Sequence, residues 1–284
     1  MTADAPRNAD DFCYRHPDRR SFVLCQRCLR TICPECQTQS AVGVICPECM
    51  TAQKQQTPKR VRRAVRRVDS RPLVTYWIVG VTVGFFILGF AFPVVQSLLA
   101  FNSAFIDPTT GVPFQPWRIF TVALVHSGFW HVGLNMLAVW LIGRSLEPLL
   151  GHGRFLALYV ISALGGSTAV ALWSTTPFVI GFDNSVVGAS GAVFGLLGAL
   201  LVIGRHIGAN ITGILIILGI NLVIGFIPGF GISWQSHLGG LAVGALLGLI
   251  YARTRRADQS VAQNLLVGAV VVALVAACAV PALV

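Results

Sequence analysis

The sequence predicts an all-α polytopic membrane protein preceded by a small cytoplasmic zinc-finger domain. The chain has 284 residues, of which 55% are hydrophobic and only 11% are charged, a balance typical of membrane proteins. Its charge is uneven, because 14 of its 21 lysines and arginines fall within residues 1–71. Seven of its eight cysteines also lie before residue 50. These three observations predict a water-exposed N-terminal part and a lipid-embedded remainder.

The N-terminal cysteines are spaced like metal ligands. Two residues separate the members of each of four pairs: Cys13 and His16, Cys25 and Cys28, Cys33 and Cys36, Cys46 and Cys49. Eight sulfur or nitrogen ligands fit two tetrahedral structural zinc ions. A segment this short cannot bury enough apolar surface to fold alone, so we expect zinc to supply its folding free energy. Since no coordination position stays open, neither ion is expected to act in catalysis.

Which pairs share a zinc ion is left open, because sequential and interleaved pairings both close acceptable loops. The order of the pairs resembles B-box-type zinc fingers and favours the interleaved arrangement. That arrangement puts Cys13, His16, Cys33 and Cys36 on one ion and Cys25, Cys28, Cys46 and Cys49 on the other. We expect this domain to be a binding module or a spacer, with a cytosolic protein as its ligand.

A basic run from Lys59 to Arg67, followed by Arg71, directly precedes the first apolar segment. Positive charge next to a membrane segment favours the cytoplasmic side. Anionic lipids are the expected partners of this run, at about 1 kcal/mol for each charge near the surface. Nucleic acid is not predicted as a partner.

Seven apolar segments follow, at residues 73–95, 127–146, 154–174, 187–204, 209–227, 235–252 and 263–283. About 20 helical residues cross a hydrocarbon core, and several segments have just that length. With the N-terminus inside, the loops predicted to be cytoplasmic contain six arginines and the outer loops contain only Arg118. The six are Arg144, Arg154, Arg205, Arg253, Arg255 and Arg256. This asymmetry predicts an extracellular C-terminus.

Polar side chains inside membrane segments are costly, so each is a functional candidate. Segments two, four and six run from outside to inside, and their starts share the outer leaflet. Ser190, His237 and His131 lie two to four residues into these segments, with Asn135 one helical turn after His131. We predict a Ser190–His237 dyad, because a neutral histidine activates a serine nucleophile. Asn221, in the fifth segment, is interpreted as an interhelical hydrogen-bond former.

Attack by a serine nucleophile on a carbonyl group forms a negatively charged oxygen, which needs hydrogen-bond donors. The backbone N–H of Ser190 and the side chains of His131 and Asn135 are the candidates. No acidic residue after Arg71 lies well inside a segment, so a catalytic triad is not predicted. The sequence also lacks the HExxH motif of a zinc protease and the paired membrane aspartates of an aspartyl protease.

These residues lie in motifs that resemble the rhomboid intramembrane serine proteases. The motifs are Trp117-Arg118, His126-SGFW-His131-VGL-Asn135, Glu147-PLL-Gly151-HG-Arg154, Gly188-Ala189-Ser190-Gly191 and His237-LGGLAV-Gly244. The resemblance implies a six-helix bundle with an outward-open aqueous cavity, Ser190 as nucleophile, and His237 as base. It also implies oxyanion contacts from His131 and Asn135, and an extra C-terminal transmembrane helix.

One position departs from the family pattern. Phe194 occupies a site that is often tyrosine in bacterial members, so we expect its ring to stack on His237 without a hydroxyl contact. Trp117 and Arg118 are interpreted as anchors at the lipid headgroups, the common role of such side chains at a membrane interface.

Together these features predict four regions and one activity. The regions are a cytoplasmic zinc-binding domain at 1–53, a basic juxtamembrane linker at 54–72, a six-helix rhomboid-like core at 73–252 and a seventh transmembrane helix at 253–284. The predicted activity is cleavage of transmembrane protein substrates in the cell membrane. The alternatives are a catalytically inactive adaptor that binds transmembrane helices, and a transporter. A transporter needs a polar path through the bilayer, whereas the polar residues here stop near the outer leaflet.

Overall fold

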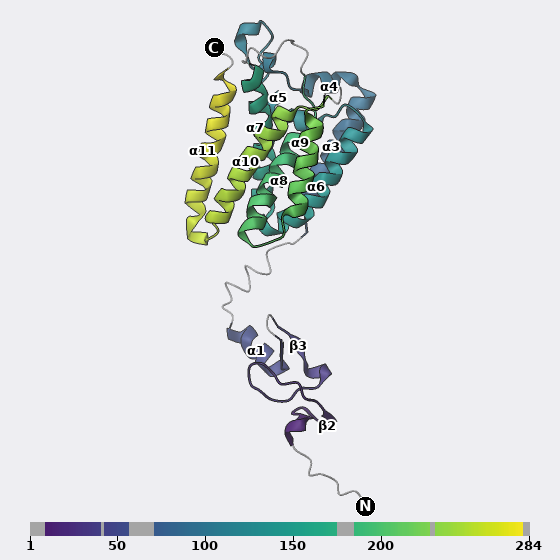
Figure 1. The fold of residues 1–284 in the computed structure, drawn as a ribbon, viewed down its shortest axis with the longest axis vertical. Coiled ribbons are helices and arrows are strands. Elements are labelled where there is room, and N and C mark those ends of the chain that lie inside the picture. The colour runs from purple at the N-terminus through teal and green to yellow at the C-terminus, as the bar shows by residue number, and fades with distance from the viewer. Residues whose placement is uncertain (1–8, 41–42, 57–70, 175–184, 228–230, 281–284) are drawn as a thin grey trace, which may run out of the picture. The chain divides into compact units, whose positions relative to one another are not determined.

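The computed structural model describes residues 9–40, 43–56, 71–174, 185–227 and 231–280. The chain forms two compact units, Met1–Asp69 and Ser70–Val284 (Figure 1). The basic run from Lys59 to Arg67 lies outside the described residues, so the prediction that it binds lipid stays a prediction.

The N-terminal unit consists of two short antiparallel hairpins and one helix. Strand β1 (Phe12–Cys13) pairs with β2 (His16–Arg20), β3 (Thr38–Gln39) pairs with β4 (Val44–Ile45), and α1 (Pro47–Gln56) follows. The buried core of this unit contains five cysteines and only two aliphatic side chains, those of Ile32 and Ile45. So small an aliphatic core cannot stabilise a fold by burial alone. The stability of this unit must therefore depend on what its cysteines bind.

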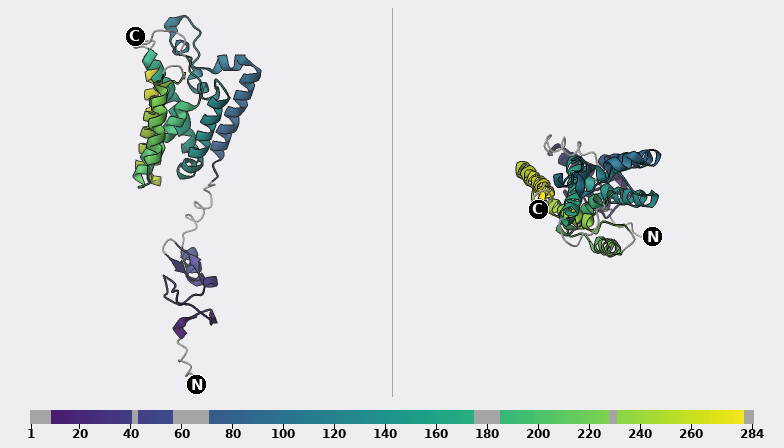
Figure 2. Two further views of the ribbon diagram at one scale, coloured as in Figure 1. Left: turned by 45° about the vertical axis from the view of Figure 1, so that its right-hand side comes forward. Right: turned by 90° about the horizontal axis from the view of Figure 1, so that it is seen from above.

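The second unit is a helical bundle (Figures 1 and 2), and in its described residues seven helices follow the seven predicted segments. They are α3 (Leu73–Ala91), α6 (Phe129–Leu150), α7 (His152–Ser174), α8 (Ser190–His206), α9 (Thr212–Gly225), α10 (Trp234–Arg253) and α11 (Ser260–Cys278). Within the described residues, α3, α7, α10 and α11 are each long and apolar enough to cross a bilayer, while α8 and α9 are apolar but shorter. The chain is a helical multi-pass membrane protein.

One predicted segment is broken, and the connection that follows it contains further short helices. Segment 73–95 is broken, because α3 ends at Ala91 and Pro93 begins a new short helix, α4 (Pro93–Leu99). Proline suits the first turn of a helix but removes a hydrogen bond from its interior. Before α6, the helix α5 (Arg118–Thr121) and the 3-10 turn Val122–Leu124 meet α6 at an angle of 96°. The connection between α3 and α6, residues 92–128 and here called the outer connection, therefore contains helical structure of its own.

The interpretation of Arg118 as a headgroup anchor is wrong. Its side chain is 3% exposed and donates hydrogen bonds to the Ser97 and Ala100 carbonyls at 2.6 and 2.7 Å. The guanidinium also bonds Gln115 Oε1 at 2.8 Å and lies over the Phe105 ring. Arg118 satisfies backbone carbonyls at the end of α4, so it organises the outer connection from within. Trp117, by contrast, is exposed.

Glycines allow α8 and α10 to approach backbone to backbone. A methyl group at Gly240 would overlap the carbonyl oxygen of Gly191, and one at Gly244 would overlap that of Gly195. Glycines spaced about four residues apart thus allow these two helices to pack closely. As a result, the N-terminal ends of α8 and α10 lie close together.

The buried carboxylate of Glu147, near the end of α6, caps the first turn of α3. It accepts hydrogen bonds from the backbone N–H groups of Val74 and Thr75 at 2.9 and 2.8 Å, and from the Thr75 hydroxyl at 2.6 Å. His152 Nδ1 lies 2.5 Å from the same carboxylate. A helix N-terminus favours negative charge and leaves N–H groups unpaired. Glu147 therefore joins two helices that are distant in sequence.

We expect Glu147→Ala to lower the free energy of unfolding of the membrane unit by about 2–4 kcal/mol, because buried N–H groups lose their acceptor. Thermal unfolding of the full chain in detergent measures the effect. Ser145→Ala is the matched control, since Ser145 is exposed on the same helix. Equal unfolding temperatures for the two variants would contradict this role.

Candidate active site

Ser190 begins α8, directly after a turn that only glycine adopts easily. Gly188 has a φ of +117°, and a methyl group at its Cα would lie 2.6 Å from His131 Nε2. Both the backbone conformation and the available space therefore exclude a larger residue here. This turn holds the Ser190 hydroxyl at the mouth of the helix.

His126 stabilises the same turn from outside α8. Its Nε2 accepts a hydrogen bond from the backbone N–H of Ala189 at 3.2 Å, and its ring meets the His131 ring edge-to-face at 5.0 Å. The sequence places His126 in the motif that also contains His131, but predicts no role for it. Its place five residues before His131 in the motif is the only signal that points to it.

His237 lies in the first turn of α10 and stacks on Phe194 of α8. The two ring centroids are 4.0 Å apart and the planes differ by 13°. This contact confirms the stacking expected of Phe194. Both rings are buried, so the orientation of the imidazole is restricted by packing.

One cavity of about 1640 Å³ brings the predicted residues of the membrane unit together. Ser190, His237, His131 and Asn135 all line it. Its walls come from α6, α7, α8, α9, α10 and the outer connection. Within the described residues Ser190 makes no side-chain hydrogen bond, and such contacts are often long before a substrate binds. The cavity joins a hydroxyl, an imidazole and further polar groups in one space.

The polar groups of α6 are held in place within the helix. Asn135 Nδ2 donates to the His131 carbonyl at 2.9 Å, and His131 Nδ1 lies 3.0 Å from the Ser127 hydroxyl. A carboxamide has two N–H groups, so one N–H of Asn135 remains for a ligand. The interpretation of Asn221 is wrong, because its amide bonds the Ile217 carbonyl of its own helix at 2.9 Å.

We expect Gly188→Ala to slow modification of Ser190 by a serine-directed fluorophosphonate about 100-fold, because a small misplacement of a reacting group has effects of that size. The added methyl group must displace either the turn or the His131 ring. Mass spectrometry of the labelled full chain measures the rate. Gly133→Ala is the control, since nothing lies within 4 Å of a methyl group at that position. Equal labelling rates in the two variants would contradict the proposed role of the turn.

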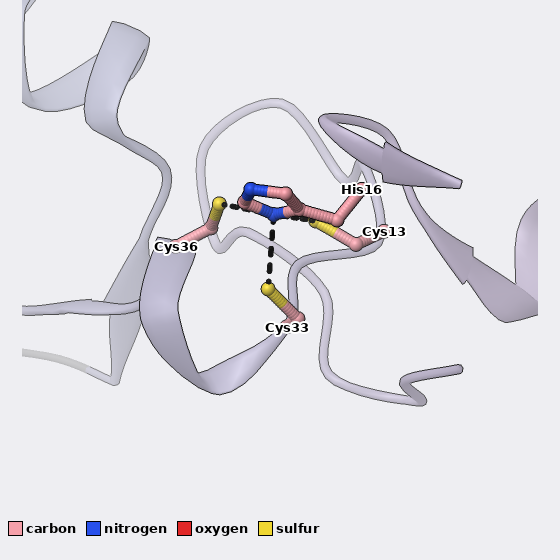
Figure 3. A group of neighbouring side chains, drawn as sticks. All are labelled: Cys13, His16, Cys33 and Cys36. Atoms are coloured by element: carbon pink, nitrogen blue, oxygen red, sulfur yellow. Dashed lines mark hydrogen bonds between the residues drawn. The ribbon is translucent and has the colours of Figure 1, made fainter. Parts of the chain in front are cut away.

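In the N-terminal unit, eight side chains form two separate clusters of metal-ligand geometry. One contains Cys13, His16, Cys33 and Cys36, and the other contains Cys25, Cys28, Cys46 and Cys49, with all ligand atoms of a cluster within 4.8 Å of one another. Figure 3 shows the His16 ring among three sulfur atoms, with Nδ1 3.3 Å from Cys33 Sγ and 3.4 Å from Cys36 Sγ. This grouping is the interleaved one of the two that the sequence left open.

The pKa values of these thiols are shifted in different directions by their surroundings. Burial opposes ionisation of Cys13 and Cys25, but nearby backbone N–H groups outweigh it and lower the pKa of each thiol to about 6. Arg30 lowers the pKa of Cys28 by donating to its sulfur at 3.4 Å. Burial raises the pKa of Cys36 to about 11 and that of Cys49 to about 12, and the neighbouring cysteines add to both shifts. Each cluster thus contains at least one thiol with a lowered pKa and one with a raised pKa.

Comparisons with known proteins agree on one family. A family model described as "Rhomboid domain" matches residues 113–254. The chain is 33% identical over 211 residues to "Rhomboid protease GluP" of Bacillus subtilis (strain 168), covering 69% of this chain and 39% of that protein. It is 36% identical over 139 residues to "Putative rhomboid protease YdcA" of the same organism, covering 47% and 66%.

A plant relative extends the comparison. The chain is 38% identical over 145 residues to "RHOMBOID-like protein 1" of Arabidopsis thaliana, covering 48% of this chain and 35% of the relative. The chain thus spans between about a third and two thirds of the length of these three relatives. The N-terminal clusters lie outside the residues matched by the family model.

Proposed function

Because this chain belongs to the rhomboid family, we propose that it is an intramembrane serine protease. Its substrates are other membrane proteins, cleaved in or next to a transmembrane segment. The observation that carries this proposal is the cavity among the membrane helices, which Ser190 and His237 line together with His131 and Asn135. A hydroxyl and a neutral imidazole facing one space are the minimum for acyl transfer by a serine.

In the proposed reaction, His237 accepts the proton of the Ser190 hydroxyl as Oγ attacks the carbonyl carbon of the scissile peptide. The backbone N–H of Ser190 and the side chains of His131 and Asn135 donate hydrogen bonds to the oxyanion that forms. His237 then transfers its proton to the departing amine. A water molecule, activated by the same imidazole, releases the acyl group and restores Ser190.

The cavity accounts for hydrolysis in an apolar medium. Lipid supplies neither water nor partners for an unpaired peptide group, so a cleavable segment must leave its helical conformation within protein. Polar side chains from α6, α8 and α10 line the cavity and are suited to hydrate it. Residues that destabilise a helix should therefore favour cleavage when they lie near the cut site of a substrate.

The proposal is tested by incubating the purified full chain with model single-span substrates and locating the cut by mass spectrometry. Cleavage inside or beside the membrane segment is the expected result. Binding of these substrates without cleavage, together with no fluorophosphonate labelling of Ser190, would instead support the inactive adaptor.

For the N-terminal unit, we propose two structural zinc ions with the ligands that the clusters group together. Cys13, His16, Cys33 and Cys36 would hold one ion and Cys25, Cys28, Cys46 and Cys49 the other. Ligands at about 2.3 Å in a tetrahedron lie about 3.8 Å apart, and Cys28 Sγ and Cys46 Sγ are 3.8 Å apart. Four protein ligands at each ion leave no position for a reacting water, so the ions would act in folding.

The proposed topology follows the distribution of arginines. The N-terminal unit and its cytosolic ligand are placed in the cytoplasm, and the C-terminus outside the cell membrane. The basic residues between α1 and α3 would face anionic headgroups on the cytoplasmic side.

A further inference from the structure

A third hairpin of the N-terminal unit, outside its two strand pairs, exposes several apolar side chains. Within residues 21–32, here called the apolar hairpin, Phe22 is 81% exposed, Leu29 70%, Leu24 46% and Val23 39%. Leu24 pairs with Thr31, and the Cys25 N–H donates to the Arg30 carbonyl, so the two arms lie side by side. Several exposed apolar side chains in one short segment make it a candidate interaction site.

Leu29 is exposed although its backbone conformation is unfavourable. Its φ of +60° makes it the only residue other than glycine with a positive φ in the described part of the chain. That conformation is costly for any residue with a Cβ atom and is normally left to glycine or asparagine. The N–H of Leu29 donates to the Cys25 carbonyl at 2.8 Å, so the turn that brings Cys25 and Cys28 into one cluster offsets part of this cost. The turn does not require a leucine, and its large apolar side chain adds to the exposed apolar surface of the hairpin.

The charged residues within the apolar hairpin, and in the two positions before it, are all arginines. Residues 19–30 contain four arginines and no acidic residue. Arg19 and Arg30 form ion pairs with Glu35 and Glu48. Arg20 and Arg27 are exposed on either side of Phe22 and Leu24 in the sequence. Apolar side chains flanked by arginines are complementary to a bilayer with anionic headgroups.

The connection to the membrane limits how far the apolar hairpin can move from lipid. Helix α1 ends at Gln56 and α3, a membrane-spanning helix, begins at Leu73. Sixteen connecting residues reach at most about 60 Å when fully extended. They include seven lysines and arginines and one acidic residue, so an anionic surface also attracts the connection itself.

We propose that the apolar hairpin docks on the anionic surface of the bilayer that holds α3. Phe22, Leu24 and Leu29 insert at the level of the headgroups, and Arg20 and Arg27 contact lipid phosphate. The N-terminal unit would then be held against the membrane by two attachments, its covalent connection and this hairpin. The inference does not depend on proteolytic activity.

Hydrogen–deuterium exchange of the full chain tests this docking. The protein is compared in nanodiscs of phosphatidylcholine alone, in nanodiscs of phosphatidylcholine mixed with phosphatidylglycerol, and in detergent. We expect peptides covering residues 21–30 to exchange about fivefold more slowly in the anionic discs than in detergent, because bound segments open less often.

The Leu29→Asn variant separates docking from folding. Asparagine accepts a positive φ more readily than leucine, so the unit should be at least as stable, and peptides covering residues 33–46 should stay protected. The slow exchange of residues 21–30 in anionic discs should nevertheless be lost, and Phe22→Ser should have the same effect. Gln55→Ala, an exposed change on α1, should leave it intact.

Two results would overturn the proposal. One is fast exchange of residues 21–30 at the same rate in anionic discs, neutral discs and detergent. The other is slow exchange at the same rate in all three that becomes fast in Leu29→Asn. That second result would assign the apolar hairpin to a protein contact instead of lipid.

Discussion

Ser190→Ala should reduce cleavage of a single-span model substrate by a factor of about 10⁴ or more, because the nucleophile is removed from a reaction that has no second route. His237→Ala should be about as severe, since the serine hydroxyl is a weak nucleophile without a base. The double variant should be no worse than either single variant, because the two groups act as one unit. Initial rates with purified full-length variants in nanodiscs measure all three.

Matched substitutions outside the cavity serve as controls. Ser145→Ala and His206→Ala remove an exposed serine and an exposed histidine from α6 and α8, and neither should change the rate. Substrate binding should survive in Ser190→Ala, because the cavity walls are unchanged. Cleavage by Ser190→Ala at the rate of the unmodified protein would rule out this serine as the nucleophile.

The number and order of the long helices are predictable from the sequence because lipid imposes a minimum length of apolar residues. The break at Pro93 is not predictable in the same way. Proline occurs both within and at the start of membrane helices, since neighbouring groups can satisfy the freed backbone. In the folded chain, Arg118 donates hydrogen bonds to the Ser97 and Ala100 carbonyls at the end of α4. This packing of the outer connection favours the turn, and it is not visible in the sequence.

Candidate residues of the site can be found from the sequence because polar groups in apolar segments are rare and conspicuous. Their supporting partners cannot. His126 bonds a backbone N–H 63 positions away, and Glu147 bonds one 72 positions away. A sequence identifies a side chain able to accept such bonds but not which amide it meets. Asn221 shows the converse, because its amide bonds within its own helix when a partner on another helix was expected.

Removing metal should unfold the N-terminal unit and leave the membrane unit intact. Structural zinc contributes about 10–16 kcal/mol to folding in small domains, whereas the aliphatic core here is limited to Ile32 and Ile45. We expect two zinc ions per chain in protein purified without chelator. After chelation, amide exchange across residues 9–56 should become fast, while exchange across α6 to α10 should not change. Metal analysis and exchange mass spectrometry on the full chain measure both effects.

Acid should have the same effect as a chelator. Zinc binds thiolates, and burial raises the pKa of Cys36 and Cys49 to about 11 and about 12, so zinc binding must release protons from these thiols. Protons therefore compete with zinc, and the metal is lost as the pH falls.

Cys33→Ser and Cys46→Ser should each lower the zinc content by about one ion per chain, since they belong to different clusters. Cys278→Ser, in α11, should not lower it, and persistent protection of residues 9–56 in chelator would show that the unit folds without metal.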